Sequence, residues 1–215
     1  MAGSDLGFEA QRRCLLKQVR FAVEAGISAV QIRERQLSDV RLADLTRDVL
    51  SIARGSGTAV LVNDRVDVAL SCGAHGVHLR SDSPSAASVR RIVPGGFLIG
   101  RSVHDAAEAA AESKDTDFLF AGTVWPTTSK REGHPLLGLS GLASIVQAAS
   151  VPVLAIGGVT VDRLRLVTAT GAVGAASIGM FMGPIDEARS LEDGYGTVKC
   201  RAVPVRSVID RVRNV

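Results

Sequence analysis

The stretch TAVLVNDRVDVALSCGAHGVHL, residues 58–79, contains two short β-rich runs with a helix-like segment between them. The runs are Thr58–Val62 and Gly76–Leu79, and the segment between them is Arg65–Leu70. A strand, a helix and a second strand in this order are typical of a parallel sheet with right-handed crossovers. The stretch therefore predicts an α/β fold.

The same alternation continues along most of the chain, at about 20–30 residues per unit. Polar residues follow nearly every expected strand, whereas an open doubly wound sheet usually binds its ligand at one glycine-rich turn. This pattern favours a (β/α)8 TIM barrel. The other expected strands are Ala29–Arg33, Phe97–Arg101, Asp117–Ala121, Val151–Ile156 and Gly174–Ile178. Further helices are expected over Asp39–Ala53, Ala106–Ser113 and Val161–Thr170, each after a plausible N-cap residue.

The two ends of the chain fit a barrel less well. The first helix is expected over Phe8–Ala25, and the residues before it, Met1–Gly7, are too few for a convincing first strand. We expect the barrel to cover residues 8–181 and an atypical, basic segment to cover residues 182–215. One hypothesis is that the strand-like run Thr197–Val205 takes the place of the missing strand.

The composition is that of a packed globular protein, with 46% hydrophobic and 22% charged residues and a net charge of +3. The three cysteines suggest neither a disulfide framework nor a zinc site, and the N-terminus lacks the blocks of a signal peptide, so we expect a cytoplasmic protein. The uncharged stretch 135–161 is broken by glycine and proline, which argues against a membrane span. The basic tail has no interleaved aromatic residues for nucleic acid. We expect small-molecule partners, and a homo-oligomer is left open.

A phosphate-binding surface is predicted at the end of the first expected strand. Gln31, Arg33 and Arg35 alternate along the chain there, so period-two geometry puts their long side chains on one face. Two guanidiniums and an amide suit a phosphate or a pyrophosphate. The alternative is a pair of surface arginines that meet Glu34 and Glu24.

A second candidate site lies directly after Thr58–Val62, where an α/β barrel holds its catalytic groups. Asn63 and Asp64 occupy this position. An aspartate there can bind Mg²⁺, or it can be the N-cap of the helix Arg65–Leu70. The residues alone leave both interpretations open.

Later strands are followed by further polar or glycine-rich loops. The loop Gly122–Lys130 is rich in hydroxyl groups and ends in a cation, as an anionic ligand requires. Ala155–Gly158 and Gly174–Gly179 offer backbone N–H groups in the manner of the phosphate cradle of such barrels. Glycines also serve tight turns, so each motif alone is a weak signal.

The histidines and a serine complete the set of candidates. His75 and His78 are expected on opposite faces of a turn and strand, which argues against a zinc site. His104 is either a positioned site residue or part of a helix cap. Ser102 is a candidate ligand hydroxyl, and the absence of a Gly-x-Ser-x-Gly elbow argues against a serine-nucleophile triad.

Taken in order, a series of motifs resembles the thiamine phosphate synthase and TenI superfamily from about residue 10 to residue 181. An ordered series is more specific than any one of its members. The resemblance implies a (β/α)8 barrel and two candidate activities. The motifs are Gln31-Ile-Arg-Glu-Arg35, Leu61-Val-Asn-Asp-Arg65-Val-Asp67, Gly76-Val-His-Leu79, Gly100-Arg-Ser-Val-His104, Pro126-Thr-Thr-Ser-Lys130, Ala155-Ile-Gly-Gly158 and Gly171–Phe181.

The first implied activity joins hydroxymethylpyrimidine pyrophosphate to a thiazole phosphate. Mg²⁺ helps pyrophosphate leave, a pyrimidine cation forms, and the thiazole nitrogen captures it. The resemblance implies that Asp64 binds Mg²⁺ and that Lys130 and Ser102 are the catalytic residues. It further implies that Gln31, Arg33, Arg35 and Asn63 hold the pyrimidine pyrophosphate, that Ser102, Thr127, Ser129 and Lys130 contact the substrates and the leaving group, and that Gly158, Ile178 and Gly179 bind the thiazole phosphate.

The turn after His78-Leu79 departs from the synthase pattern. A synthase normally shows Gly-Gln-x-Asp there, which supplies a second carboxylate for Mg²⁺, whereas this chain reads Arg80-Ser-Asp-Ser83. Ser83 stands in the place of that carboxylate, and Asp82 lies one position away. We take Asp82 as the candidate second metal ligand, because a loop could compensate for the offset.

Other departures point to the second activity. Arg35, which replaces the usual lysine, and the loss of Gly-Gln-x-Asp resemble TenI, a metal-independent thiazole tautomerase. The catalytic histidine of TenI falls on Thr123, which cannot act as an acid or base near neutral pH. Gly179 replaces a phosphate-binding serine and keeps only its backbone N–H. We expect synthase-like pyrimidine transfer, with a tautomerase or a non-catalytic thiamine-precursor binding or regulatory protein as alternatives.

Overall fold

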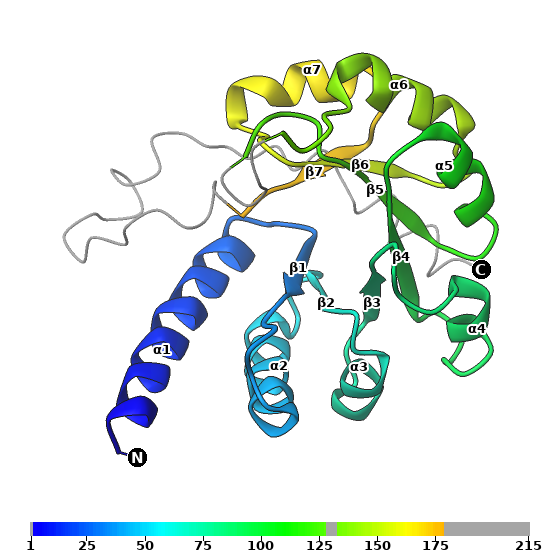
Figure 1. Cartoon of the computed structure of the whole chain (residues 1–215). Coiled ribbons are helices and arrows are strands. Elements are labelled where there is room, and N and C mark those ends of the chain that lie inside the picture. Colours follow the sequence, from blue (N-terminus) through cyan, green and yellow to red (C-terminus); the bar gives the residue numbers. More distant parts are fainter. Residues whose placement is uncertain (1, 128–132, 179–215) are drawn as a thin grey trace.

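Seven parallel strands form one curled sheet in the computed structural model of the chain, and helices cover its outer face (Figure 1). The structure describes residues 2–127 and 133–178, with side chains from residue 9 onward. The strands are β1 (Ala29–Ile32), β2 (Ala59–Asn63), β3 (Gly76–Leu79), β4 (Leu98–Val103), β5 (Phe118–Gly122), β6 (Val153–Ile156) and β7 (Gly174–Ala176). The helices are α1 (Ala2–Glu24), α2 (Asp39–Ala53), α3 (Val66–Cys72), α4 (Ala86–Arg90), α5 (Ala106–Glu112), α6 (Gly138–Ala148), η1 (Val161–Arg163) and α7 (Leu164–Ala169).

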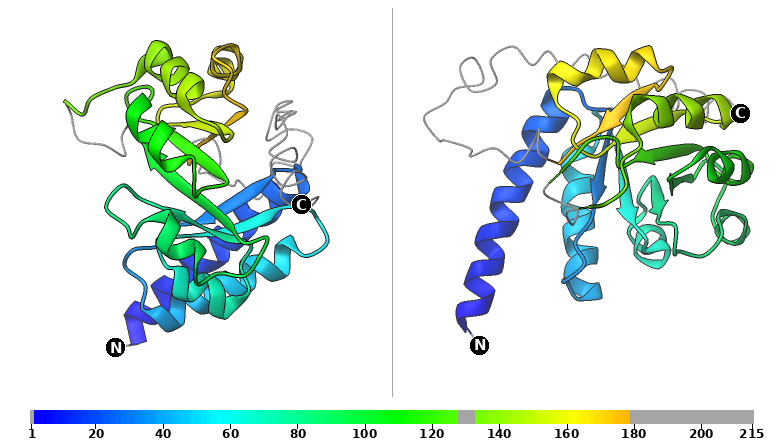
Figure 2. Two further views of the ribbon diagram at one scale, coloured as in Figure 1. Left: turned by 90° about the vertical axis from the view of Figure 1, so that its right-hand side faces the viewer. Right: turned by 45° about the horizontal axis from the view of Figure 1, so that its top comes forward.

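The strands pair in the order of the sequence, β1-β2-β3-β4-β5-β6-β7, and every pair is parallel. Two further views show α1–α3 at one end of the curled sheet and α5–α7 at the other (Figure 2). All seven strands expected from the sequence are present, and no end differs by more than two residues. The TIM-barrel-like α/β fold predicted from the sequence is confirmed.

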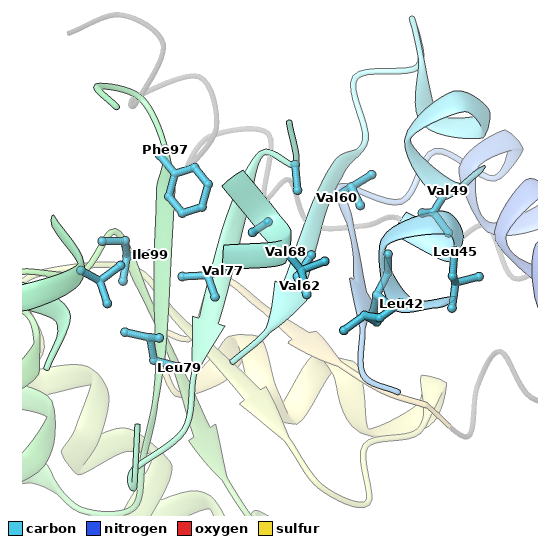
Figure 3. Packing of buried hydrophobic residues seen from close by; sticks show 14 of the residues in the cluster. Leu42, Leu45, Val49, Val60, Val62, Val68, Val77, Leu79, Phe97 and Ile99 are labelled. Atoms are coloured by element: carbon cyan, nitrogen blue, oxygen red, sulfur yellow. The ribbon is translucent and has the colours of Figure 1, made fainter. Parts of the chain in front are cut away.

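The outer face of the sheet carries the apolar side chains that bind the helices. On β2, Val60 and Val62 are fully buried and pack with Leu45 and Val49 of α2 (Figure 3). A second cluster joins the outer face of β4–β6 to α5–α7. Burying this apolar surface from water holds the helices to the sheet, since each aliphatic side chain contributes about 1.5–3 kcal/mol.

The inner face carries the alternate residues of the same strands. Leu61, Leu98, Phe118, Phe120 and Leu154 form a separate cluster there. The polar residues at the carboxyl ends of β1–β4 share this inner face, because successive side chains of a strand point to opposite sides. The alternation of side chains along each strand therefore places the candidate site on the inner face of the curled sheet, next to this apolar cluster.

Helix starts follow the expected capping residues. Ser38 precedes α2 and its hydroxyl accepts a hydrogen bond from the backbone N–H of Arg41, while Asp105 caps α5 through the N–H of Glu108. The expected helix Val161–Thr170 begins instead as the short 3₁₀ turn η1 before α7.

The N-terminal residues form no strand, since α1 already begins at Ala2. In the described ranges the sheet has β1 and β7 as its edges, and no eighth strand pairs with them. The hypothesis that Thr197–Val205 fills that place concerns residues outside the described ranges, as does the expected basic segment 182–215. No described helix has the length and apolarity that a membrane crossing requires.

Candidate functional site

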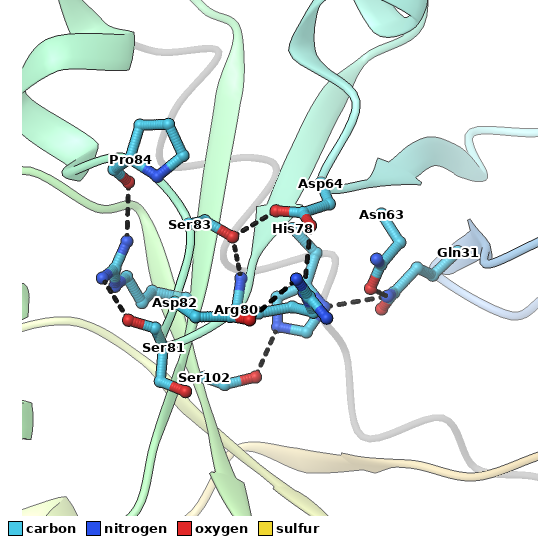
Figure 4. Close-up of polar contacts among 11 residues, drawn as sticks. Gln31, Asn63, Asp64, His78, Arg80, Ser81, Asp82, Ser83, Pro84 and Ser102 are labelled. Atoms are coloured by element: carbon cyan, nitrogen blue, oxygen red, sulfur yellow. Dashed lines mark hydrogen bonds and ion pairs between the residues drawn. The ribbon is translucent and has the colours of Figure 1, made fainter. Parts of the chain in front are cut away.

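A chain of hydrogen-bonded side chains crosses the inner face at the carboxyl ends of β1–β4 (Figure 4). Gln31 Nε2 donates to Asn63 Oδ1 at 2.9 Å and lies 2.8 Å from His78 Nδ1. His78 Nε2 lies 3.0 Å from Ser102 Oγ. Parallel register brings these residues together, since Asn63 is paired with His78 across β2 and β3. The predicted site residues Gln31, Asn63 and Ser102 thus form one hydrogen-bonded chain with His78.

The contacts of His78 define its protonation state. The Gln31 amide nitrogen can only donate, so His78 Nδ1 accepts and Nε2 carries the proton that is donated to Ser102. Burial, with smaller contributions from Arg33 and Arg101, lowers the pKa of His78 to about 4, against the opposing effect of Asp64. The imidazole is therefore neutral near pH 7, and the Ser102 hydroxyl keeps its own proton to donate to a ligand.

Arg33 and Arg35 follow directly after β1, beside the same edge of the sheet. Burial lowers the pKa of the Arg33 guanidinium, and the nearby charges of Arg35 and Arg80 lower it further. Within residues 2–127 and 133–178, neither Arg33 nor Arg35 forms an ion pair, so a surface pair with Glu34 and Glu24 is not what the structure shows. The site therefore gathers positive charge from two loops.

Asp64 faces the turn after β3 rather than the helix that follows it. Arg80 Nε donates to Asp64 Oδ2 at 2.9 Å, and Ser83 Oγ donates to Asp64 Oδ1 (Figure 4). Arg80 also donates to Asp82 Oδ2 at 2.9 Å. The N-cap interpretation of Asp64 is wrong, because Arg65 precedes α3 and makes no side-chain cap bond. Asp64 instead adopts a φ of 68°, which turns its carboxylate toward Arg80.

These side chains do not fit a magnesium ion as they are placed. Mg²⁺ requires near-octahedral oxygen ligands, whereas a guanidinium lies between Asp64 and Asp82 and a hydroxyl fills the other side of Asp64. In the part of the chain that the structure describes, no three His, Cys, Asp or Glu side chains lie together as a metal site. The turn therefore directs the Asp82 carboxylate to the Arg80 guanidinium and not to a metal position shared with Asp64.

Arg101 holds the turn that carries Arg80. Its guanidinium is buried on the outer face of β4 and donates to the carbonyl oxygens of Pro84, at 2.8 Å, and Ser81, at 3.2 Å. Its Nε also lies 3.1 Å from a Glu112 carboxylate oxygen of α5. Because these bonds tie both ends of the turn to the barrel wall, they position the residues between them.

The glycine pair after β6 lies against the loop after β5. A Cβ on Gly158 would come within 2.5 Å of the Pro126 carbonyl oxygen, and one on Gly157 within 2.5 Å of the Thr123 side chain. The tight packing of two loops thus explains both glycines. Of the other residues assigned to this region, Thr127 is half-buried, Ile178 has 54% of its surface exposed, and Ser129, Lys130 and Gly179 lie outside the described residues.

His104 links two neighbouring strand ends. Its Nδ1–H donates to the carbonyl oxygen of Gly122 at 2.6 Å, and α5 is capped by the Asp105 side chain. The His104 side chain is therefore a positioning group for the end of β5.

Residues 6–181 match the sequence pattern of the family described as thiamine monophosphate synthase. The chain belongs to this family. It is 40% identical over 184 residues to the thiamine-phosphate synthase of Methanoregula boonei, a match that covers 84% of this chain and 85% of the relative. It is 37% identical over 185 residues to that of Syntrophomonas wolfei, covering 84% and 88%.

Solved structures agree with this assignment. A thiamine phosphate pyrophosphorylase from Pyrococcus furiosus superposes with a TM-score of 0.72 at 33% identity, covering 92% of this chain and 90% of that one. A 3-hexulose-6-phosphate synthase, at a TM-score of 0.59 and 18% identity, shows the fold alone. The resemblance to the thiamine monophosphate synthase family is confirmed, and the chain is an enzyme of thiamine biosynthesis.

The sequence analysis does not predict two residues of this site, His78 and Arg80. The signal that could identify His78 is a lone polar residue between Val77 and Leu79, which indicates an inward-facing side chain in a buried strand. In the sequence, Arg80 is only a departure from the synthase motif. Its role depends on the fold of the turn, which no local pattern reports.

Proposed function

We propose that this chain transfers hydroxymethylpyrimidine from its pyrophosphate to thiazole phosphate, which yields thiamine phosphate and free pyrophosphate. The bond from the pyrimidine methylene carbon to oxygen breaks, and its electron pair leaves with pyrophosphate. The lone pair of the thiazole nitrogen then forms the new carbon–nitrogen bond. The observation that carries this proposal is the cluster of Arg33, Arg35 and Arg80 beside the hydrogen-bonded Gln31–His78–Ser102 chain.

The two halves of this arrangement suit the two parts of the pyrimidine substrate. Guanidiniums favour the pyrophosphate as it gains charge in leaving. The amides of Gln31 and Asn63 and the Ser102 hydroxyl supply directional hydrogen bonds inside the curl, as a heteroaromatic ring requires. Thr127, Gly158 and Ile178 stay candidates for the thiazole phosphate side, together with Ser129, Lys130 and Gly179.

The magnesium requirement implied by the resemblance stays a prediction. Asp64 and Asp82 are its candidate ligands, and Arg80 contacts both of them. No step of the proposed reaction depends here on the metal. Small-molecule substrates and a cytoplasmic location belong to the same proposal, and the free thiols of Cys14 and Cys72 agree with a reducing compartment.

Thr123 weighs against the tautomerase alternative. It lies at the position of the tautomerase histidine, is 5% exposed and has no titratable group to move a proton. The non-catalytic alternative predicts saturable precursor binding without turnover.

One assay separates the proposed transfer from the two alternatives. The full chain is incubated with both precursors, with Mg²⁺ or with a chelator, and thiamine phosphate and pyrophosphate are measured. We expect both products in equal amounts and a loss of about a hundredfold or more in Asp64→Ala, because Arg80 loses one of the two carboxylates that hold it. Asp44→Ala, on the exposed face of α2, is the matched control. Folded protein that forms no thiamine phosphate under either condition contradicts the proposal.

A further inference from the structure

The Arg80 guanidinium is placed to bind an anion while two carboxylates hold it. Asp64 and Asp82 each take one of its nitrogens, and a guanidinium has more N–H donors than these contacts use. The Arg80 side chain is 33% exposed, so part of the group faces solvent. The backbone N–H of Arg80 donates to Ser83 Oγ at 2.8 Å, which closes the turn around it.

Arg33 and Arg35 bring further positive charge to the same place. The lowered pKa of Arg33 reflects burial and the proximity of both Arg35 and Arg80. Burial and the like charges of Arg35 and Arg80 disfavour the charged Arg33 guanidinium, and a bound anion would offset both effects. The planar donors of arginine match phosphate oxygens in pairs.

We propose that the Arg80 guanidinium supplies the positive charge that a divalent cation would supply in this site, so that Arg33, Arg35 and Arg80 bind pyrophosphate without Mg²⁺. The inference rests on the proposed function, because pyrophosphate is the group that the proposed reaction releases. Asp64 and Asp82 are positioning residues that aim the guanidinium. The disagreement between these side chains and a magnesium site is thereby explained.

Arg80 acts on the bond that breaks. When the carbon–oxygen bond of the pyrimidine pyrophosphate opens, its electron pair stays on the departing oxygen and the pyrophosphate gains negative charge. A guanidinium that is already oriented stabilises that charge without reorganising. No proton has to move, since arginine stays protonated.

The test measures binding of inorganic pyrophosphate to the full chain by titration calorimetry, once with excess EDTA and once with Mg²⁺. We expect saturable binding in EDTA, and an affinity that Mg²⁺ changes by less than about tenfold. Binding that requires Mg²⁺ overturns the proposal, and this comparison needs no variant.

Arg80→Gln tests the residue itself. We expect the affinity for pyrophosphate in EDTA to fall about tenfold or more. Arg91→Gln is the matched control, because the Arg91 side chain is exposed at the far end of α4 and donates to the hydroxyl of Ser88. Equal binding by Arg80→Gln and the wild type overturns the proposal. Arg80→Lys, which keeps the charge and loses the planar donors, is expected to bind with intermediate affinity, and wild-type affinity in it overturns the part played by the guanidinium.

The binding test and the turnover assay fail independently. If the protein forms thiamine phosphate but binds pyrophosphate only with Mg²⁺, the result supports the proposed function and refutes this inference. If it binds pyrophosphate in EDTA through Arg80 but forms no product, the result supports the metal-free anion site and refutes the proposed function.

Discussion

His78 Nε2 lies 3.0 Å from Ser102 Oγ, so a neutral imidazole on β3 orients a hydroxyl on β4. The opposite ring nitrogen accepts from Gln31, which leaves Nε2 as the donor. Phe120 meets the ring edge-on, with centroids 4.6 Å apart, and restricts its rotation. The Ser102 hydroxyl is consequently preorganised as a donor toward the interior of the curl.

Ser102→Ala is expected to lower the kcat of thiamine phosphate formation about tenfold to a hundredfold, because a hydrogen bond that orients the pyrimidine is lost. The protein should stay folded, since His78 keeps its bond to Gln31. Steady-state kinetics and a urea unfolding curve measure the two effects. Ser144→Ala, on the exposed side of α6, is the control. Unchanged kcat in Ser102→Ala contradicts a role in the reaction.

The pH dependence of stability is expected to depend on His78. Burial, helped by Arg33 and Arg101, lowers its pKa to about 4, so between about pH 6.5 and pH 4 the unfolded chain binds a proton that the folded protein excludes. This stabilisation is complete above about pH 6.5 and is lost as the pH falls toward 4. The loss at pH 5, relative to pH 7.5, amounts to about 2 kcal/mol. Urea unfolding at pH 5 and pH 7.5 should show a smaller pH effect in His78→Asn. Equal pH effects in the two proteins refute this assignment.

Arg101→Met is expected to lower the free energy of unfolding by about 3 kcal/mol, because Glu112 and the carbonyl oxygens of Ser81 and Pro84 lose a buried donor. Pyrophosphate binding should weaken as well, since the turn that carries Arg80 loses its anchor. Chemical denaturation and calorimetry test both effects, with Arg91→Met as the exposed control. A variant with wild-type stability and binding contradicts the positioning role of Arg101.

Gly158→Ala is expected to destabilise the protein by about 2–4 kcal/mol. Its φ of 62° disfavours a side chain, and the added Cβ would meet the Pro126 carbonyl oxygen at 2.5 Å. Gly95→Ala is the control, since nothing lies within 4 Å of a Cβ there. Thermal unfolding of both variants measures the difference. Similar melting temperatures would show that the two loops do not pack as described.

The sequence alone was sufficient to predict the helices and strands and their order along the chain. Val60, Val62 and Leu61 alternate between two buried faces, and Ser38 and Asp105 mark helix starts through local hydrogen bonds. Such signals involve residues close in the chain, so they are readable without a fold. The ordered motifs likewise sufficed for the family.

The candidate site was predicted as a set of residues, not as an arrangement. Gln31, Asn63 and Ser102 follow from their places at strand ends, because parallel strands align those ends. The role of Asp64 could not be decided from the sequence, because a helix N-cap and a metal ligand both use an aspartate side chain at this position.

Sequence by itself determined the α/β alternation, the family and the strand ends that carry the site, because periodicity and capping act over a few residues. Only the tertiary structure decided that Arg80 lies between Asp64 and Asp82 and that His78 is a buried, neutral donor. The physical reason is distance along the chain: Arg80 and Asp64 are 16 residues apart and His78 and Ser102 are 24 apart, so their contacts exist only once the sheet has curled.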